Sequence, residues 1–226
     1  MKEVADSLCL FEPSVDETML ISEYMSLPVD AILTTNYTYE IEKSVNSRFA
    51  GRFGCRNKYR KKVYTSAGKY EINQLYTFFS INEDNPSIWH IHGEAAKPDT
   101  MVIGHYNYGK LLAKIQQYVS KLMARYKMCI SKGSDIEKFN WVDYFLLSDV
   151  YIVGLGMDLS EMDLWWLINC KKRHFKDKKT VLYKLDIKKE EEMLAEAYGV
   201  EVVKYVNKKD DYKTYYKWIC DDIRKR

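Results

Sequence analysis

Three short stretches decide the fold: ILTTNY at residues 32–37, WHIHG at residues 89–93 and VYIVGLGMD at residues 150–158. Each is an apolar, largely β-branched run that stops at small or polar residues, which is typical of a buried strand followed by a turn. In an open parallel sheet, ligands bind outside the carboxyl ends of the strands. Strand ends that carry an asparagine, a histidine and a Gly-x-Gly turn therefore predict a nucleotide site with a candidate base.

Strands and helices alternate along the rest of the chain. Apolar runs predict further strands at residues 101–104, 180–185 and 200–206, and the helical spacing of apolar residues predicts helices at 13–27, 37–49, 108–129, 136–147 and 161–170. This alternation predicts an α/β fold with a Rossmann-like, mostly parallel sheet and helices on both faces. A small β-hairpin is expected within residues 61–72. Because the 226 residues contain no repeat or convincing linker, we expect one domain over residues 1–226.

Composition excludes several classes of protein. The net charge of +3, from 35 basic and 32 acidic residues, is too small to indicate a nucleic-acid partner. Basic runs at residues 56–62 and 171–179 are expected to be solvated surface, with a patch for a phosphate or an acidic partner as the alternative. The five cysteines form no C-x-x-C pair, which argues against both a zinc module and a disulfide framework and fits a reducing cytoplasm. Neither a signal peptide nor an apolar stretch of roughly 18–20 residues is present, so we expect a cytoplasmic protein without a membrane span.

The three stretches, with Glu42 following the first, resemble those of the sirtuin-like (silent information regulator type) proteins. They are most similar to the bacterial branch, in which many members degrade NAD as antiviral-defence effectors. The resemblance covers residues 30–170. It implies that NAD is the substrate, that Asn36 and His92 are the catalytic residues, and that Gly154 and Gly156 lie against the nucleotide.

Further nucleotide contacts are expected around the same strand ends. Thr35 and Tyr37 flank Asn36, and Gly93 follows the proposed catalytic histidine. Asp158 could hydrogen-bond an adenosine ribose, as acidic residues do in dinucleotide-binding folds, although a helix-start role is an equal alternative.

The chain departs from the sirtuin-like pattern at two places. The family opens with a strand and a Gly-rich turn that holds the pyrophosphate, whereas residues 1–29 contain no glycine and residues 16–25 read as a helix. The family's aspartate two residues after the asparagine is replaced by Thr38. We therefore expect weak NAD binding by this chain alone, and a homo-oligomer or a partner protein that completes the site.

Several candidate residues have more than one interpretation. His92 could be a general base or a strand-end histidine, and His90, on the same side of the strand, could form a metal pair with it, completed by His105 or Asp158. We expect no metal, because no further ligands follow at a recognised spacing.

The side chains around the turns are equally open to interpretation. Asn36 could bind a ribose hydroxyl or water, or could cap the following helix, on which Glu42 is expected to be solvated. Trp165 and Trp166 are expected to pack in the core or in an interface, with stacking on adenine as the alternative.

Two functions of different classes follow from these patterns. The first is hydrolysis of NAD to nicotinamide and ADP-ribose in a bacterial defence or toxin protein. The second is a catalytically impaired module of the same fold that binds a nucleotide or ADP-ribose or serves assembly. A deacylase is disfavoured, because the zinc module of protein-deacetylating sirtuins is absent.

Overall fold

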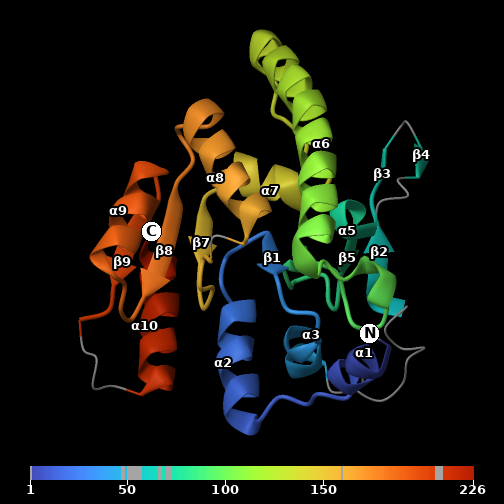
Figure 1. The fold of residues 1–226 in the computed structure, drawn as a ribbon, viewed down its shortest axis with the longest axis vertical. Coiled ribbons are helices and arrows are strands. Elements are labelled where there is room, and N and C mark those ends of the chain that lie inside the picture. The colour runs from blue at the N-terminus through green and yellow to red at the C-terminus, as the bar shows by residue number, and fades with distance from the viewer. Residues whose placement is uncertain are drawn as a thin grey trace. The chain divides into compact units, whose positions relative to one another are not determined.

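The structure is a computed structural model that describes residues 2–46, 49, 58–65, 68–69, 73–158, 160–206 and 211–226 (Figure 1). The chain divides into two compact units. The first unit comprises Met1–Val102, Phe139–Trp141 and Tyr212–Arg226, and the second comprises Ile103–Lys138 and Val142–Asp211.

The first unit contains a four-stranded sheet whose strands follow the order β1 (Ala31–Thr34), β6 (Ser87–His90), β5 (Thr77–Phe79) and β2 (Arg60–Lys62). Strands β1 and β6 are parallel, and their register pairs Thr34 with His90. Strand β5 runs antiparallel to both of its neighbours. The predicted hairpin is represented by β3 (Tyr64–Thr65) and β4 (Gly68–Lys69), which pair antiparallel, while residues 66–67 and 70–72 lie outside the described residues.

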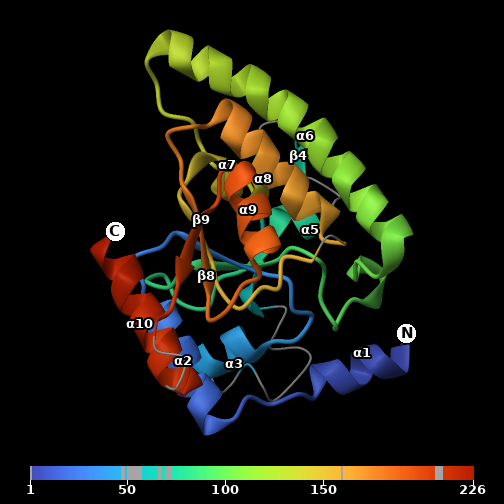
Figure 2. The ribbon, with the colours of Figure 1, turned by 60° about the vertical axis from the view of Figure 1, so that its left-hand side comes forward.

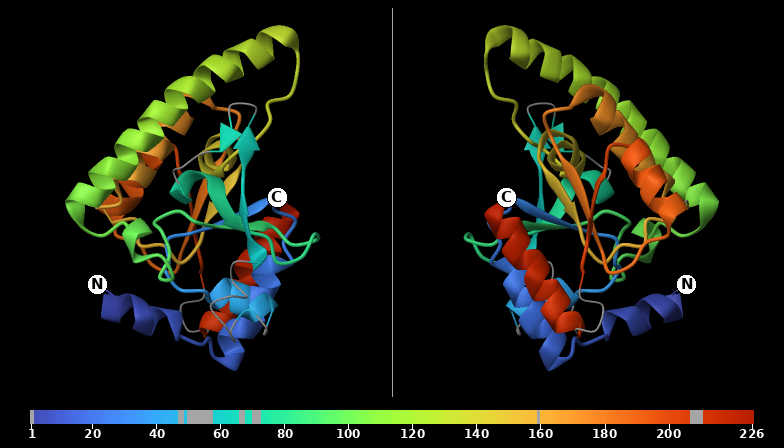
Figure 3. Two further views of the ribbon diagram at one scale, coloured as in Figure 1. Left: turned by 90° about the vertical axis from the view of Figure 1, so that its right-hand side faces the viewer. Right: turned by 90° about the vertical axis from the view of Figure 1, so that its left-hand side faces the viewer.

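Helices of the first unit include α1 (Lys2–Cys9), α2 (Val15–Met25), α3 (Glu40–Val45), α5 (Asn73–Tyr76) and α10 (Tyr212–Lys225). Helix α2 begins with a capping box, in which Ser14 and Glu17 satisfy each other's backbone N–H groups. It lies beside α10, where the rings of Tyr24 and Tyr216 meet edge to face at 6.0 Å (Figure 3). Within residues 2–30 the structure shows two helices and no strand before β1.

The second unit contains a parallel sheet in the order β7 (Val150–Ile152), β8 (Thr180–Lys184) and β9 (Glu201–Lys204). Helix α8 (Met162–His174) connects the first pair of strands and α9 (Lys189–Ala197) the second. Helix α6 (Gly104–Lys132) lies alongside α8 (Figures 1 and 2). The predicted α/β fold class, with Rossmann-like alternation of strands and helices, is thus confirmed.

Helix α7 (Trp141–Leu147) is held against α6 by a buried carboxylate. Both oxygens of Asp143 accept hydrogen bonds from the Tyr118 hydroxyl, at 2.8 and 2.7 Å, and Oδ2 also accepts one from Arg125 at 2.9 Å. Arg125 donates in addition to the carbonyl of Glu137. The predicted helix at 136–147 is shorter in the structure, where it begins at Trp141.

The predicted strand at 101–104 is also wrong. Met101 and Val102 are buried, but they lie in a loop, and α6 begins at Gly104. Their apolar character reflects burial, not membership of the sheet. Among the described residues, no helix is both long enough and apolar enough to span a membrane.

Lys171 on α8 is buried, with 1% of its surface exposed. Its ammonium group donates to the carbonyls of Ser148 at 2.6 Å and Lys179 at 2.8 Å, which lie just before β7 and β8. Burial lowers the pKa of this lysine to about 7, because the charged form loses its hydration. The helix is thus joined to the start of both strands by a lysine that is largely neutral above neutral pH.

Replacement of Lys171 by Met should change how stability depends on pH. In the unfolded chain the lysine has an ordinary pKa near 10.4, so unfolding takes up a proton between about pH 7 and pH 10, and stability rises with pH across that window. From pH 7.5 to 8.5 the wild-type free energy of unfolding should rise by about 1 kcal/mol relative to that of Lys171→Met. Denaturant titrations test this, with exposed Lys189→Met as the control. Equal pH dependence of Lys171→Met and the wild type would contradict the assignment.

Candidate functional site

The parallel register of β1 and β6 brings two predicted catalytic residues to one edge of the first unit's sheet. Thr34 pairs with His90, and the N–H of Ile91 donates to the Thr34 carbonyl at 3.0 Å. Asn36 and His92 each follow two residues later. Because parallel strands end at the same edge, both leave the sheet at its carboxyl side.

The side chain of Asn36 is exposed and makes no hydrogen bond within the described part of the chain. Its backbone N–H donates to the Thr34 hydroxyl at 3.1 Å, which shapes the turn. The N-cap of α3 is Tyr39, so the alternative in which Asn36 caps this helix is wrong. An amide that offers both a donor and an acceptor to solvent is suited to a ribose hydroxyl or a water molecule.

His92 is buried, and its main chain is fixed on both sides. Its carbonyl accepts a hydrogen bond from the N–H of Val102 at 2.8 Å. Gly93 has φ +94°, and a Cβ there would lie 2.1 Å from the Thr100 carbonyl oxygen, so only glycine fits. The Tyr37 hydroxyl donates to the Val102 carbonyl at 2.8 Å. Gly93 and Tyr37, both predicted nucleotide contacts, therefore have structural roles that position His92.

His90 and Glu42 form a buried ion pair next to the turn that contains Asn36. His90 Nδ1 lies 2.8 Å from the Asn36 carbonyl oxygen, and Nε2 lies 2.7 Å from Glu42 Oε1 on α3. Both partners are acceptors, so both ring nitrogens donate and the ring is an imidazolium. Burial by itself lowers the pKa of His90, but the charge and hydrogen bond of Glu42 outweigh it, and the pKa lies above its ordinary value.

This pair overturns the expectation that Glu42 is solvated. Glu42 is fully buried, and its second oxygen, Oε2, has no hydrogen-bond partner among the described residues, so the carboxylate depends on His90 for charge compensation. The arrangement also removes His90 from the alternative metal pair with His92, since both of its ring nitrogens are occupied. The contact between His90 and Glu42 could have been inferred from the pairing of β1 with β6, because this register places His90 beside the turn that leads into α3.

A second buried pair supports the same region. The carboxylate of Glu94 accepts hydrogen bonds from Arg60 and from the Tyr39 hydroxyl, the latter at 2.8 Å. The Tyr39 ring packs on the His90 ring at 5.4 Å between centroids. The imidazolium is thus enclosed by aromatic and ionic contacts of one unit.

In the second unit, the Gly-x-Gly turn follows β7. Lys184, at the end of β8, donates to the carbonyls of Leu155 and Gly156, each at 3.0 Å, and burial lowers the pKa of its ammonium group. Gly154 has φ +68° and Met157, a non-glycine residue, has φ +59°. A Cβ on Gly156 would meet nothing within 4 Å, so this glycine is open to an approaching ligand. No motif in the sequence marks Lys184, although it ends β8, the strand next to β7 in the sheet, and so lies beside the turn.

Asp158 and Trp165 fix the far end of this turn. Asp158 Oδ1 accepts a hydrogen bond from the Ser160 N–H at 2.8 Å, and this bond lowers the pKa of the carboxyl group. The Trp165 indole N–H donates to the Asp158 carbonyl at 3.1 Å, and its ring packs on Tyr198. Asp158 therefore shapes the turn before α8, whose N-cap is Glu161, and Trp165 has a packing role.

Within an α/β fold, the first unit thus places an exposed asparagine and a buried histidine at the carboxyl edge of two parallel strands. Residues 30–137 match the family model of the SIR2-like domain, which supports a sirtuin-like domain in this part of the chain. This match supports an NAD-related function. No curated protein and no solved structure matches the chain.

Replacement of Glu42 by Gln should be strongly destabilising. It leaves a buried ring without its counter-ion, which typically costs about 3 kcal/mol or more. The pKa of His90 is higher in the folded than in the unfolded protein, so the ion pair stabilises the fold fully below the unfolded pKa near 6.5. This stabilisation is lost as pH rises through the folded pKa. Glu42→Gln should therefore make the free energy of unfolding depend less on pH over this range. Denaturant titration against pH tests both effects. The exposed control Glu191→Gln should change stability by less than about 0.5 kcal/mol, and a similarly small loss in Glu42→Gln would contradict the ion pair.

Alanine at the two glycines should have opposite consequences. Gly93→Ala should lose about 3 kcal/mol or more, because the new Cβ meets the Thr100 backbone and the positive φ is strained. Gly156→Ala should leave the free energy of unfolding within about 1 kcal/mol of the wild type, since space is open and its φ is not positive. Thermal and denaturant unfolding measure both, and a large loss in Gly156→Ala would show that this turn is closed by the chain itself.

Proposed function

We propose that this chain hydrolyses the nicotinamide–ribose bond of NAD. The observation that carries the proposal is the free, exposed amide of Asn36 at the same sheet edge as His92. The SIR2-like match over residues 30–137 supports NAD as the substrate class.

The leaving group needs no proton from the protein, because the pyridinium departs as neutral nicotinamide. The barrier falls when the oxocarbenium-like ribose is stabilised and when water or a ribose hydroxyl is oriented and deprotonated. The imidazole of His92 supplies the base, because imidazole is the side chain that most often serves as a general base. The Asn36 amide binds the ribose hydroxyl or the water, and His90 holds the Asn36 carbonyl from behind.

The nucleotide contacts proposed for the first unit are Thr35, Tyr37 and Gly93, and those for the second unit are Gly154, Gly156 and Asp158. Thr35 is partly exposed, and Gly156 leaves space for a ligand. Lys184 adds a positive charge beside the second group. An ammonium group has three donors, of which the two loop carbonyls occupy two. Because residues 1–29 contain no glycine, we expect these residues to hold the pyrophosphate poorly, with a Kd for NAD of roughly 0.1 mM or above, and a homo-oligomer or partner protein that strengthens binding.

We place this activity in a bacterial antiviral-defence or toxin setting, because the three strand-end stretches are most similar to that branch of sirtuin-like proteins. In this setting the reaction depletes the cell of NAD. The competing function is a binding module that holds NAD or ADP-ribose without turnover.

Variants of the two central residues test the proposal. Asn36→Ala should lower kcat by roughly 30- to 1000-fold, the effect of losing one transition-state hydrogen bond, while the melting temperature stays unchanged because the amide has no partner among the described residues. His92→Ala should abolish turnover. NAD consumption and nicotinamide release, followed by chromatography, measure both, with exposed His105→Ala as the control.

Three results would refute this assignment. Unchanged turnover in Asn36→Ala would remove the asparagine from the reaction. Loss of activity in His105→Ala equal to that in His92→Ala would indicate general damage in place of a base. Binding of ADP-ribose by a wild-type protein that never consumes NAD, alone or concentrated into oligomers, would replace hydrolysis by the binding function.

A further inference from the structure

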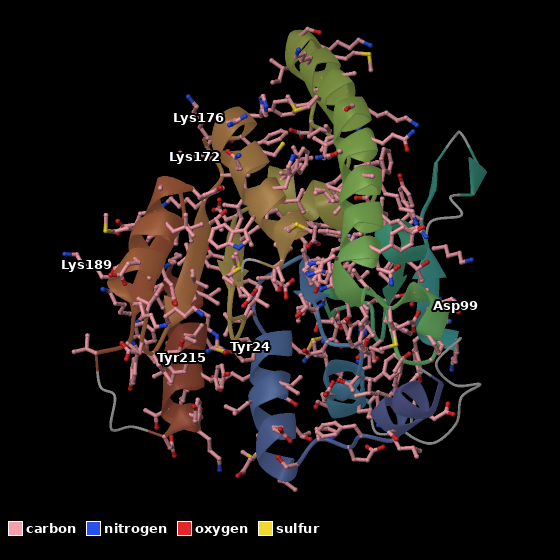
Figure 4. The ribbon with its side chains drawn as sticks, in the orientation of Figure 1. Tyr24, Asp99, Lys172, Lys176, Lys189 and Tyr215 are labelled. Atoms are coloured by element: carbon pink, nitrogen blue, oxygen red, sulfur yellow. The ribbon has the colours of Figure 1, made fainter. Side chains whose placement is uncertain are left out.

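A basic groove lies at the outer end of α8, within the second unit. Its volume is about 570 Å³, and it is lined by Asn169, Lys172, Arg173, Lys176, Ala197 and Tyr198. Such a volume is typical of sites for small organic ligands. Asn169, Lys172 and Arg173 are spaced i, i+3 and i+4 and so share one face of α8, and Lys176 follows shortly after this helix ends at His174. Figure 4 shows Lys172 and Lys176 together at this end, with Lys189 apart from them on α9.

Part of the groove is fixed before any ligand arrives. The Tyr198 ring is held edge-on by Trp165, with 5.1 Å between the ring centroids. Lys172 donates to the Ala197 carbonyl, and its stem lies 3.1 Å from the position of a Cβ on Gly199. By contrast, no described residue pairs with Arg173, with Lys176 or with the Asn169 amide. The groove therefore has a rigid aromatic wall and cationic groups that are free to bind.

The charge of the groove indicates the ligand. Three cationic side chains line it, and no acidic residue does. The carboxyl ends of α8 and α9 lie here too, and each contributes roughly half a negative charge. The sum is about +2, which complements a phosphate monoester, whose charge is about −1.5 to −2 at neutral pH. A guanidinium fork is the side chain best suited to phosphate oxygens.

We propose that this groove binds a small phosphomonoester that carries a flat ring. Its phosphate contacts Arg173 and Lys176, and its ring lies against Tyr198. The site is separate from the glycine turn, because Met162 and Arg173 are 11 residues apart on α8, or roughly 16 Å along the helix axis. It is also independent of the proposed hydrolysis of NAD.

The site is tested by calorimetric titration of the full chain with AMP, adenosine and inorganic phosphate at 0.15 M salt. The NMR signal of the Asn169 amide reports whether the ligand binds in the groove. AMP should bind more tightly than phosphate or adenosine. Arg173→Ala should weaken AMP binding at least tenfold without a change in melting temperature, whereas Lys189→Ala, an exposed lysine that does not line the groove, should bind AMP as the wild type does.

The outcomes separate this site from the proposed active site. Arg173→Ala should retain NAD turnover, and Asn36→Ala should still bind AMP with the Asn169 shift. The proposal is overturned if adenosine binds as tightly as AMP, if Arg173→Ala binds AMP like the wild type, or if AMP leaves the Asn169 amide unmoved. Phosphate binding as tight as AMP binding would overturn the role of Tyr198.

Discussion

The buried ion pair between His90 and Glu42 is the interaction on which the candidate site depends. It joins the end of β6 to the carbonyl of Asn36 and to Glu42 on helix α3, which lie 54 and 48 residues earlier in the chain. Removing two charges from water costs several kcal/mol per ion, and their attraction offsets this only where geometry and hydrogen bonding are good. Here both ring nitrogens are satisfied. The pair is therefore better understood as a device that specifies one geometry for the Asn36 turn than as a source of net stability.

The sequence predicts the strands better than it predicts the contacts. The runs at 32–37, 89–93 and 150–158 give β1, β6 and β7 because buried strands have a strong apolar, β-branched signal. Strand β5 escapes prediction, and β2 falls partly within the predicted hairpin at 61–72 but pairs with β5 instead. The apolar run at 101–104 misleads, since periodicity over four residues cannot distinguish a strand from a buried loop. Glu42 is misassigned for a different reason: its burial follows from a partner 48 residues away, which no local pattern reveals.

Lysine is used in this chain as an internal donor to carbonyl groups. Lys43 contacts the Cys9 and Phe11 carbonyls, Lys171 those of Ser148 and Lys179, and Lys184 those of the glycine turn. An ammonium group has three donors on a long flexible stem, so it can satisfy carbonyls that no strand or helix serves. Basic runs in this chain are accordingly not uniform solvated surface. Within the run at 171–179, the first lysine is a core residue and its neighbours form the basic groove.

The main chain around His92 is fixed by the β1–β6 ladder before it and by the Val102 hydrogen bond and Gly93 contact after it. The backbone freedom of this residue is therefore lost when the chain folds, and not when a ligand binds. A group that is already ordered makes its interactions without a further entropic penalty at association, which is the principle of preorganisation. The corresponding vulnerability lies in residues 94–101. An insertion or deletion there would release the histidine's backbone while leaving every side chain of the strand ends in the sequence.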